Sequence, residues 1–531
     1  MRNAVVILAA AAIMVLGVIG SGIIFLDEQR LKLLVAQHVE NHTGRRIEIR
    51  GPLRVRLFPG LRLNAEQVIM LPPEGFEGPE LFRAERVDMK VRLLALVRGR
   101  VDASDVRLSG ARINLHTDQS GRSSLEGLGR DRTPRVSDWT SGPITLEQAV
   151  ISVSDAGRSG SEVLEMERID LAGVAPGRPV EFRFRGNVEQ PAAFDSLEVD
   201  GLLVPGGNGA ARLSNMRLQA TIDGGRYQLE LRGNVSYSGD PPMQLELDGG
   251  ILLLNDHRFL VEGNYLSGDR PYLAASIASD FFDVDVLALP GKLGELTLMP
   301  RDAGVLTALR GFDFDIAMQV SEVARLGLVL EDARVEMEGR GGVVGIAMAP
   351  TRMPGAMLAG SASIDLRQQP PVVESLVSVD VNRASKMLES LRLFPFVDGQ
   401  GSLLLDLEAV ANDDAPGTAS WVGSGSIELW EGHWPLLVEL KGADAEGLDN
   451  GRFDLFRSSL TLGPSSLLAD DLSLVSDSMV VRGQTGFLFP EQALFGQLHL
   501  DANGRVERVE LAGNLARPEI RRSPLLIPPA Q

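Results

Sequence analysis

The chain contains no cysteine. Disulfides, thiol nucleophiles, zinc–thiolate sites and iron–sulfur clusters are therefore excluded. Basic residues are in deficit, because 52 lysines and arginines face 71 aspartates and glutamates, which gives a net charge of −19. Nucleic-acid-binding domains normally carry a basic excess, so we expect no nucleic-acid partner. Aromatic residues make up only 5% of the chain, and the neighbouring Trp421, Trp430 and Trp434 therefore favour interfacial packing over a ligand shelf.

The sequence motifs of common catalytic sites are missing as well. The chain has neither a Gly-x-x-x-x-Gly-Lys phosphate loop nor a Gly-x-Ser-x-Gly nucleophile elbow. The segment from His38 to His42, HVENH, places its glutamate one residue later than a zinc protease requires, about 100° further around a helix. We therefore expect no enzymatic activity, no catalytic or metal-binding residues and no cofactor.

Long hydrophobic runs are missing except at the N-terminus. The run from Ala4 through Val15 to Leu26 carries no charge. At ~1.5 Å per residue it reaches roughly 34 Å, enough for a bilayer core of about 30 Å. We predict an uncleaved transmembrane anchor over residues 1–26, with a cleaved signal peptide as the alternative. Arg2 and the amino terminus favour a cytoplasmic N-terminus, which would place the bulk of the chain in the periplasm of a two-membrane bacterium.

What the sequence does contain is apolar–polar alternation. In GRRIEIRGPLRVRLFPGLRLN, residues 44–64, the aliphatic and charged residues fall on opposite sides of an extended chain. A period of two predicts strands with one apolar and one charged face. The pattern recurs along the chain, and the apolar residues that we expect to line one face of the sheet are Ile47, Ile49, Leu53, Val55, Leu57, Phe182, Phe184, Met216, Leu218, Tyr227, Leu229, Leu231, Leu245, Leu247, Leu403, Leu405 and Leu407.

Few segments have a helical pattern. Residues 27–44 predict an amphipathic helix. Asn382 is a candidate cap for a short helix over residues 383–393, with Ala384, Met387, Leu388 and Leu391 on one face. The other gaps between strands are too short for crossover helices, so the sheet should be largely antiparallel. The predicted fold class is mostly β, a long, antiparallel, curved β-groove with an N-terminal transmembrane helix and a few short helices.

The apolar face could be covered in two ways. In an ordinary sandwich a second sheet would pack against it. In a curved, uncovered sheet the face would instead line a trough for acyl chains, because aliphatic side chains hold hydrocarbon without fixing its direction. The sequence leaves both arrangements open.

Several segments resemble the AsmA family, relatives of TamB and of the chorein-type bridge lipid-transfer proteins. TGRRIEIRGPLRVRLFPGLRL, then Glu74-Gly75-Phe76, and then AERVDMKVRLLALVRGRVDASDVRLSGARINLHTDQSGR resemble the start of the family. ITLEQAVISVSDAGRSG at 144–160 resembles its next hairpin. FDFDIAMQVSEVARLGLVLEDARVEMEGRGGVVGIAMAP at 312–350 and LAGNLARPEIR at 511–521 resemble its C-terminal region. Ser123-Ser124 stands where many relatives have a tryptophan.

The resemblance implies an inner-membrane-anchored periplasmic protein of outer-membrane biogenesis. Its implied organisation is an anchor (1–26), an amphipathic helix (27–44), two AsmA-like β-groove lobes (45–300 and 301–517) and a Pro-rich tail (518–531). The implied function is transfer of phospholipid towards the outer membrane, and its implied partners are phospholipid, the inner membrane and outer-membrane components or assembly machinery. A scaffold or assembly factor for outer-membrane proteins is the alternative.

Overall fold

The computed structural model describes most of the chain after the N-terminus. The described residues are 28, 29, 32, 33, 36, 37 and 40, and 45–524 with gaps at 57–60, 77, 93–100, 119–123, 125–138, 156–160, 174–177, 191–193, 207–209, 223, 239–242, 269, 288–309, 326, 369–370, 394, 412–418, 436, 438–450, 478, 489–492, 503–504 and 515–516. The predicted anchor and Leu57 lie outside the described residues. Within the described part, no helix has both the length and the apolar character needed to cross a bilayer.

The chain divides into two compact units, and the first comprises residues 1–256 and 260–269. The described helical positions between 28 and 40 lie in the segment predicted to be an amphipathic helix, and Glu28 there accepts a hydrogen bond from the backbone N–H of Leu53 at 3.1 Å. The strands of this unit are β1 (Ile47–Ile49), β2 (Leu53–Arg56), β3 (Leu61–Met70), β4 (Phe82–Val91), β5 (Val101–Ser109), β6 (Arg112–Thr117), β7 (Trp139–Ser141), β8 (Ile144–Asp155), β9 (Ser161–Leu171), β10 (Val180–Gln190), β11 (Phe194–Pro205), β12 (Ala211–Ile222), β13 (Tyr227–Ser238) and β14 (Gln244–Leu254).

The second unit comprises residues 257–259 and 270–531, so that β15 (His257–Leu266) contributes residues to both units. Its further elements are β16 (Tyr272–Asp283), the 3₁₀ helix η5 (Val284–Leu287), β17 (Asp313–Arg325), β18 (Leu328–Arg340), β19 (Val343–Met353), β20 (Ala356–Asp365), β21 (Val372–Val381), helix α5 (Ala384–Ser390), β22 (Asp398–Ala411), β23 (Ala419–His433), β24 (Arg452–Leu462), β25 (Ser466–Ser476), β26 (Met479–Leu488), β27 (Ala493–Ala502), β28 (Arg505–Asn514) and β29 (Arg517–Pro524). The predicted boundary at 300/301 lies outside the described residues, and β29 occupies the first half of the predicted Pro-rich tail.

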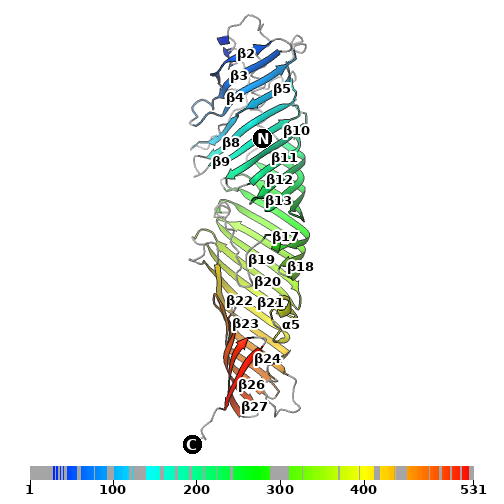
Figure 1. The fold of residues 1–531 in the computed structure, drawn as a ribbon, viewed down its shortest axis with the longest axis vertical. Helices are drawn as coiled ribbons and strands as arrows, with labels where there is room; N and C mark the ends of the chain where they lie inside the picture. The colour runs from blue at the N-terminus through cyan, green and yellow to red at the C-terminus, as the bar shows by residue number, and fades with distance from the viewer. Residues whose placement is uncertain are drawn as a thin grey trace. The chain divides into compact units, whose positions relative to one another are not determined.

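Successive strands form antiparallel pairs in both units, as β10–β13 show in the first and β17–β20 in the second (Figure 1). The predicted mostly-β, largely antiparallel fold is therefore confirmed. The sheet is nevertheless mixed, because β8 pairs parallel with β5 and β6, β7 pairs parallel with β5, and β17 pairs parallel with β16. In sequence, long connections separate β6 from β7 and η5 from β17. Parallel pairing needs such a long connection, because a short hairpin turn can join only antiparallel neighbours.

Several strands contain a residue with positive φ in their interior, namely Gln67, Gln148, Asn215, Asp332 and Glu431. At Asn215 the register of β12 against β13 shifts between Leu213 and Met216. Such β-bulges bend a strand and increase its twist while the pairing continues on both sides. The described sheet is therefore locally bent at fixed positions in both units.

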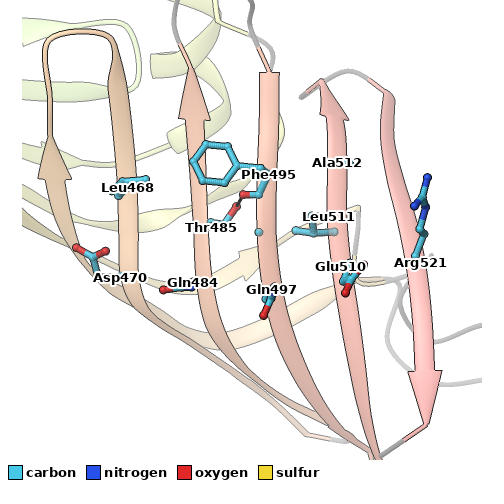
Figure 2. A pocket seen from close by; sticks show the side chains of 11 residues that line it. Leu468, Asp470, Gln484, Thr485, Phe495, Gln497, Glu510, Leu511, Ala512 and Arg521 are labelled. Carbon is cyan, nitrogen blue, oxygen red and sulfur yellow. Dashed lines mark hydrogen bonds between the residues drawn. The ribbon is translucent and has the colours of Figure 1, made fainter.

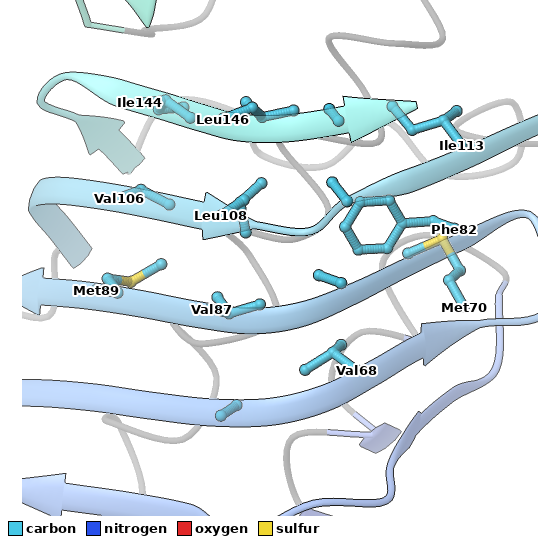
Figure 3. Close-up of a cluster of buried hydrophobic side chains, with 14 of the residues drawn as sticks. Val68, Met70, Phe82, Val87, Met89, Val106, Leu108, Ile113, Ile144 and Leu146 are labelled. Atoms are coloured by element: carbon cyan, nitrogen blue, oxygen red, sulfur yellow. The ribbon is translucent and has the colours of Figure 1, made fainter. Parts of the chain in front are cut away.

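Buried apolar side chains gather into two large clusters, one in each unit. Cluster 1 in the first unit unites residues of β1–β6 and β8–β10, with Val68, Met70 and Phe82 fully buried (Figure 3). Cluster 2 in the second unit unites α5 with residues of β20–β28, and Leu474 and Val481 are fully buried there. A filled apolar core thus covers part of the sheet in each unit.

Helix α5 follows the prediction on its buried face and departs from it at its cap. Ala384, Met387 and Leu388 are buried as expected, but the helix ends at Ser390, so that Leu391 is its C-cap residue and packs half-buried against cluster 2. Arg383 is the N-cap residue and makes no side-chain cap hydrogen bond, so the assignment of Asn382 as the cap is wrong. The carboxylate of Asp398 in β22 instead accepts a hydrogen bond from the backbone N–H of Ser385 at 3.1 Å. A residue distant in sequence supplies this cap, which local pattern cannot reveal.

Candidate functional site

A continuous row of apolar side chains crosses β8–β14 in the first unit. Each member lies directly opposite the next one in the antiparallel register, so all of them point to the same face of the sheet. We call this set apolar row 1, and its members are Leu146, Ile169, Phe184, Val199, Leu218, Leu231 and Leu252.

Burial changes along apolar row 1. Leu146 is only 1% exposed because it belongs to cluster 1. The row members from Ile169 to Leu252 are half-buried. Apolar side chains that keep part of their surface in water gain less from folding than core residues do. This part of the row therefore has free apolar surface that another apolar molecule could cover.

The opposite face of the same strands carries charge. Arg168, Arg185, Glu198 and Glu230 lie in register across β9–β13. Arg185 pairs with Glu198 at 3.2 Å, and Arg217 pairs with Glu230 at 2.9 Å. Arginines and carboxylates of this face thus pair with one another. The face is charged and hydrated, in contrast to the face that carries apolar row 1.

The charged face also shifts the pKa values of two carboxyl groups. Hydrogen bonding by Arg217, and to a smaller extent by Arg232, lowers the pKa of Glu230 below its ordinary value. Hydrogen bonding by Arg168, helped by the hydroxyl of Thr145, lowers the pKa of Asp170. Both carboxylates are therefore ionised at neutral pH and serve as structural partners of arginine.

A second row crosses β16–β24 in the second unit. We call this set apolar row 2, and its members are Ile277, Met318, Val335, Met348, Gly360, Val377, Leu405, Gly425 and Leu460. The row residues from Ile277 to Leu405 are half-buried, whereas Glu336, Ser361 and Asp406 on the opposite face are exposed. The alternation in sequence thus becomes two chemically different faces.

Glycines in and beside apolar row 2 allow the strands to approach closely. A Cβ on Gly425 would lie 2.3 Å from the carbonyl oxygen of Leu404, and one on Gly401 would lie 1.9 Å from that of Glu428. Real Cβ atoms cannot come so near a neighbouring backbone, so these positions require glycine. The same lack of side chains leaves the apolar face open at these strands.

The structure places the predicted lining residues in two environments. Ile47 and Leu53 belong to cluster 1, and Ile49, Val55, Phe182 and Phe184 pack against it. The remaining described candidates are half-buried, apart from Met216, which is 7% exposed. They are Leu218, Tyr227, Leu229, Leu231, Leu245, Leu247, Leu403, Leu405 and Leu407.

Other row members were not predicted. Val199, Leu252, Met318, Val335 and Met348 have the same alternating neighbours as the candidates, but only the strand register shows that they continue the rows. Among the tryptophans, Trp434 packs against cluster 2 at 6.4 Å from the ring of Phe456, whereas Trp430 is 41% exposed. No group of acidic or histidine residues within the described chain could hold a metal ion.

Comparison with known proteins agrees with the resemblance noted in the sequence. The family model described as AsmA family matches residues 1–157. Protein AsmA of Escherichia coli (strain K12) is 21% identical over 499 residues, which cover 85% of this chain and 79% of that protein. No solved structure matches the chain. The similarity therefore extends over sequence from both units.

Proposed function

Because the chain belongs to the AsmA family, we propose that it carries phospholipid along its apolar face, from the inner membrane towards the outer membrane. Residues 1–26 would anchor it in the inner membrane, with the N-terminus in the cytoplasm and the strands in the periplasm. The predicted curvature of the sheet into a groove is part of this proposal. The observation that carries it is the pair of half-buried apolar rows.

The length of apolar row 1 suits a lipid chain. Its half-buried part crosses six strands, from β9 to β14, and neighbouring strands lie ~4.8 Å apart, so it extends about 24 Å. One leaflet of a bilayer is about 15 Å thick in its hydrocarbon part. The row is therefore long enough to contact an extended acyl chain along its whole length.

The chemistry of the rows favours movement over fixed binding. Each buried methylene contributes about 0.8 kcal/mol wherever it lies on an apolar surface. No polar side chain interrupts apolar row 1, so an acyl chain displaced along it exchanges one aliphatic contact for another. Such a surface supports passive transfer that requires no nucleotide hydrolysis.

The charged face of the sheet is unsuitable for acyl chains, which supports the assignment of lipid to the opposite face. Its arginines and carboxylates form ion pairs such as Arg217 with Glu230. Dehydrating these groups against hydrocarbon would cost free energy. Lipid chains would therefore stay on the face with the apolar rows, and the headgroups would remain in water.

Site-specific photo-crosslinking in cells tests this function. A photoreactive amino acid at Leu218 should capture phospholipid, and the same probe at the neighbouring Gln219, on the opposite face, should not. Capture of lipid at both positions, or of no lipid at Leu218, would contradict the proposal.

The alternative function is a scaffold that assists assembly of outer-membrane proteins. Among the described strands, β29 pairs only with β28, so its other edge could accept a strand from a partner. Photoprobes on apolar row 1 would then capture polypeptide instead of lipid, and a probe at Ile520 in β29 would capture the same polypeptide.

A further inference from the structure

The second unit has a hollow on the face opposite to its apolar row. Gln484, Gln497, Glu510 and Arg521 lie opposite one another across the four strands β26–β29 (Figure 2). All four side chains are exposed. Leu498, which follows Gln497 in the chain, is fully buried on the other face of the sheet. The hollow has a volume of about 550 Å³, within the ~300–1,000 Å³ range of small-molecule sites.

An aromatic ring forms one side of this hollow. Phe495 is 42% exposed, which is unusual for so large an apolar side chain. It lies opposite Gly486, where a Cβ would be 2.4 Å from Cζ of the ring. The glycine thus makes room for the ring of Phe495 to lie across the sheet beside Leu468, and the other side of the ring faces solvent (Figure 2).

The polar side chains around the ring supply both donors and acceptors. Asp470 accepts a hydrogen bond from the hydroxyl of Thr461 at 2.7 Å, and its other carboxylate oxygen can accept a further one. Gln497 accepts a hydrogen bond from Arg508 at 3.3 Å through its Oε1, which leaves its amide NH₂ to donate. Gln484 adds a second amide group directly opposite Gln497.

From this arrangement we propose that the hollow binds a hexopyranose unit of a saccharide. A pyranose ring has an apolar C–H face, which can lie on the exposed ring of Phe495, and a rim of hydroxyls that both donate and accept hydrogen bonds. The amides of Gln484 and Gln497 match that rim. Arg521 is accompanied by Asp470 and Glu510, so the hollow is not selective for an anion, and its polar rim is unsuitable for an acyl chain.

The test uses the full-length protein in detergent and three free disaccharides, namely maltose, lactose and N,N′-diacetylchitobiose. We expect saturation-transfer NMR to show binding of at least one of them. Replacing Phe495 with leucine keeps Gly486 covered but removes the flat ring, and should weaken the binding about tenfold, whereas Phe495→Tyr should retain it. Absence of binding for all three, or unchanged binding in Phe495→Leu, would overturn the proposal.

A double variant shows whether weaker binding could result from a folding defect. Gln484→Ala with Gln497→Ala changes two exposed side chains and should also weaken binding, without a change in melting temperature. Leu404→Ala removes an exposed apolar residue outside the hollow and should leave binding intact. Adding lactosylceramide to the same detergent solution, with phosphatidylcholine as the control, then tests a glycolipid headgroup: loss of the disaccharide signals with lactosylceramide alone would show that the hollow also accepts a lipid-linked saccharide. These measurements do not depend on lipid transfer along the apolar rows.

Discussion

In the first unit, β3–β8 and β10–β14 share one alternating sequence pattern, but they bury their apolar residues differently. Val68, Phe82 and Leu108 in the earlier strands are 0% exposed, whereas Val199 and Leu218 in the later strands are half-buried. The apolar residues of the earlier strands pack on one another in cluster 1. Alternation therefore decides which face is apolar, and the surrounding elements decide whether that face is covered.

The second unit shows the same contrast in the opposite order along the chain. Met318 and Val335 are half-buried in the earlier strands, whereas Leu474, Val481 and Leu498 in the later strands are fully buried. The apolar residues of the later strands pack in cluster 2 together with helix α5 and with residues outside the strands, such as Leu437. Each unit thus combines a packed region, which stabilises it, with an apolar region that remains accessible.

The largest expected effect separates packed from accessible residues. Phe82→Ala removes a fully buried ring from cluster 1 and should lower the free energy of unfolding by about 3–5 kcal/mol. Leu218→Ala removes a half-buried side chain and should cost only about 1 kcal/mol. Urea unfolding followed by circular dichroism measures both. Equal losses would show that apolar row 1 is packed as tightly as cluster 1.

A glycine substitution sharpens the comparison in the second unit. Gly401→Ala forces a Cβ towards the carbonyl oxygen of Glu428 and should cost about 1–3 kcal/mol. Gly345→Ala is the matched control, because its nearest backbone atom, the carbonyl oxygen of Glu338, would lie 3.9 Å away. Thermal melting of the two variants compares them. A control as unstable as Gly401→Ala would mean that close strand approach is not the cause.

The next effect concerns the helix that covers part of cluster 2. Asp398→Ala removes the hydrogen bond to the backbone of Ser385 and should lower stability by about 1 kcal/mol, the usual contribution of a cap. Asn382→Ala should have almost no effect, since Arg383 is the N-cap residue. Urea titration gives both values. A larger loss for Asn382→Ala would restore the cap predicted from the sequence.

The smallest effect is expected on the charged face, and it depends on pH. Hydrogen bonding by Arg217 lowers the folded-state pKa of Glu230, so its stabilising contribution is present above the unfolded pKa of about 4.3 and is lost as pH falls below that value. Unfolding free energy should therefore decrease between pH 5 and pH 3. Arg217→Ala should reduce that decrease slightly, because exposed ion pairs contribute little. A steeper decrease in the variant would contradict the assignment.

The sequence predicts well which face of each strand is apolar. It predicts poorly which other residues pack against that face. The alternation around Leu218 and Leu405 identifies the apolar side, and helical spacing identifies the buried face of α5. It does not reveal the parallel pairing of β16 with β17, the cap from Asp398 or the position of Phe495 over Gly486. Each of these depends on residues far apart in the chain, whereas alternation is a property of neighbours.

The central claim is that the half-buried apolar rows hold lipid, and native mass spectrometry of the detergent-extracted protein tests it most directly. We expect phospholipid to remain bound to the wild-type protein and to be lost when Leu218 and Leu231 are both replaced by aspartate, while replacement of Gln219 on the opposite face by aspartate leaves it bound. A wild-type protein that carries no phospholipid, or a double variant that retains as much, would contradict the account.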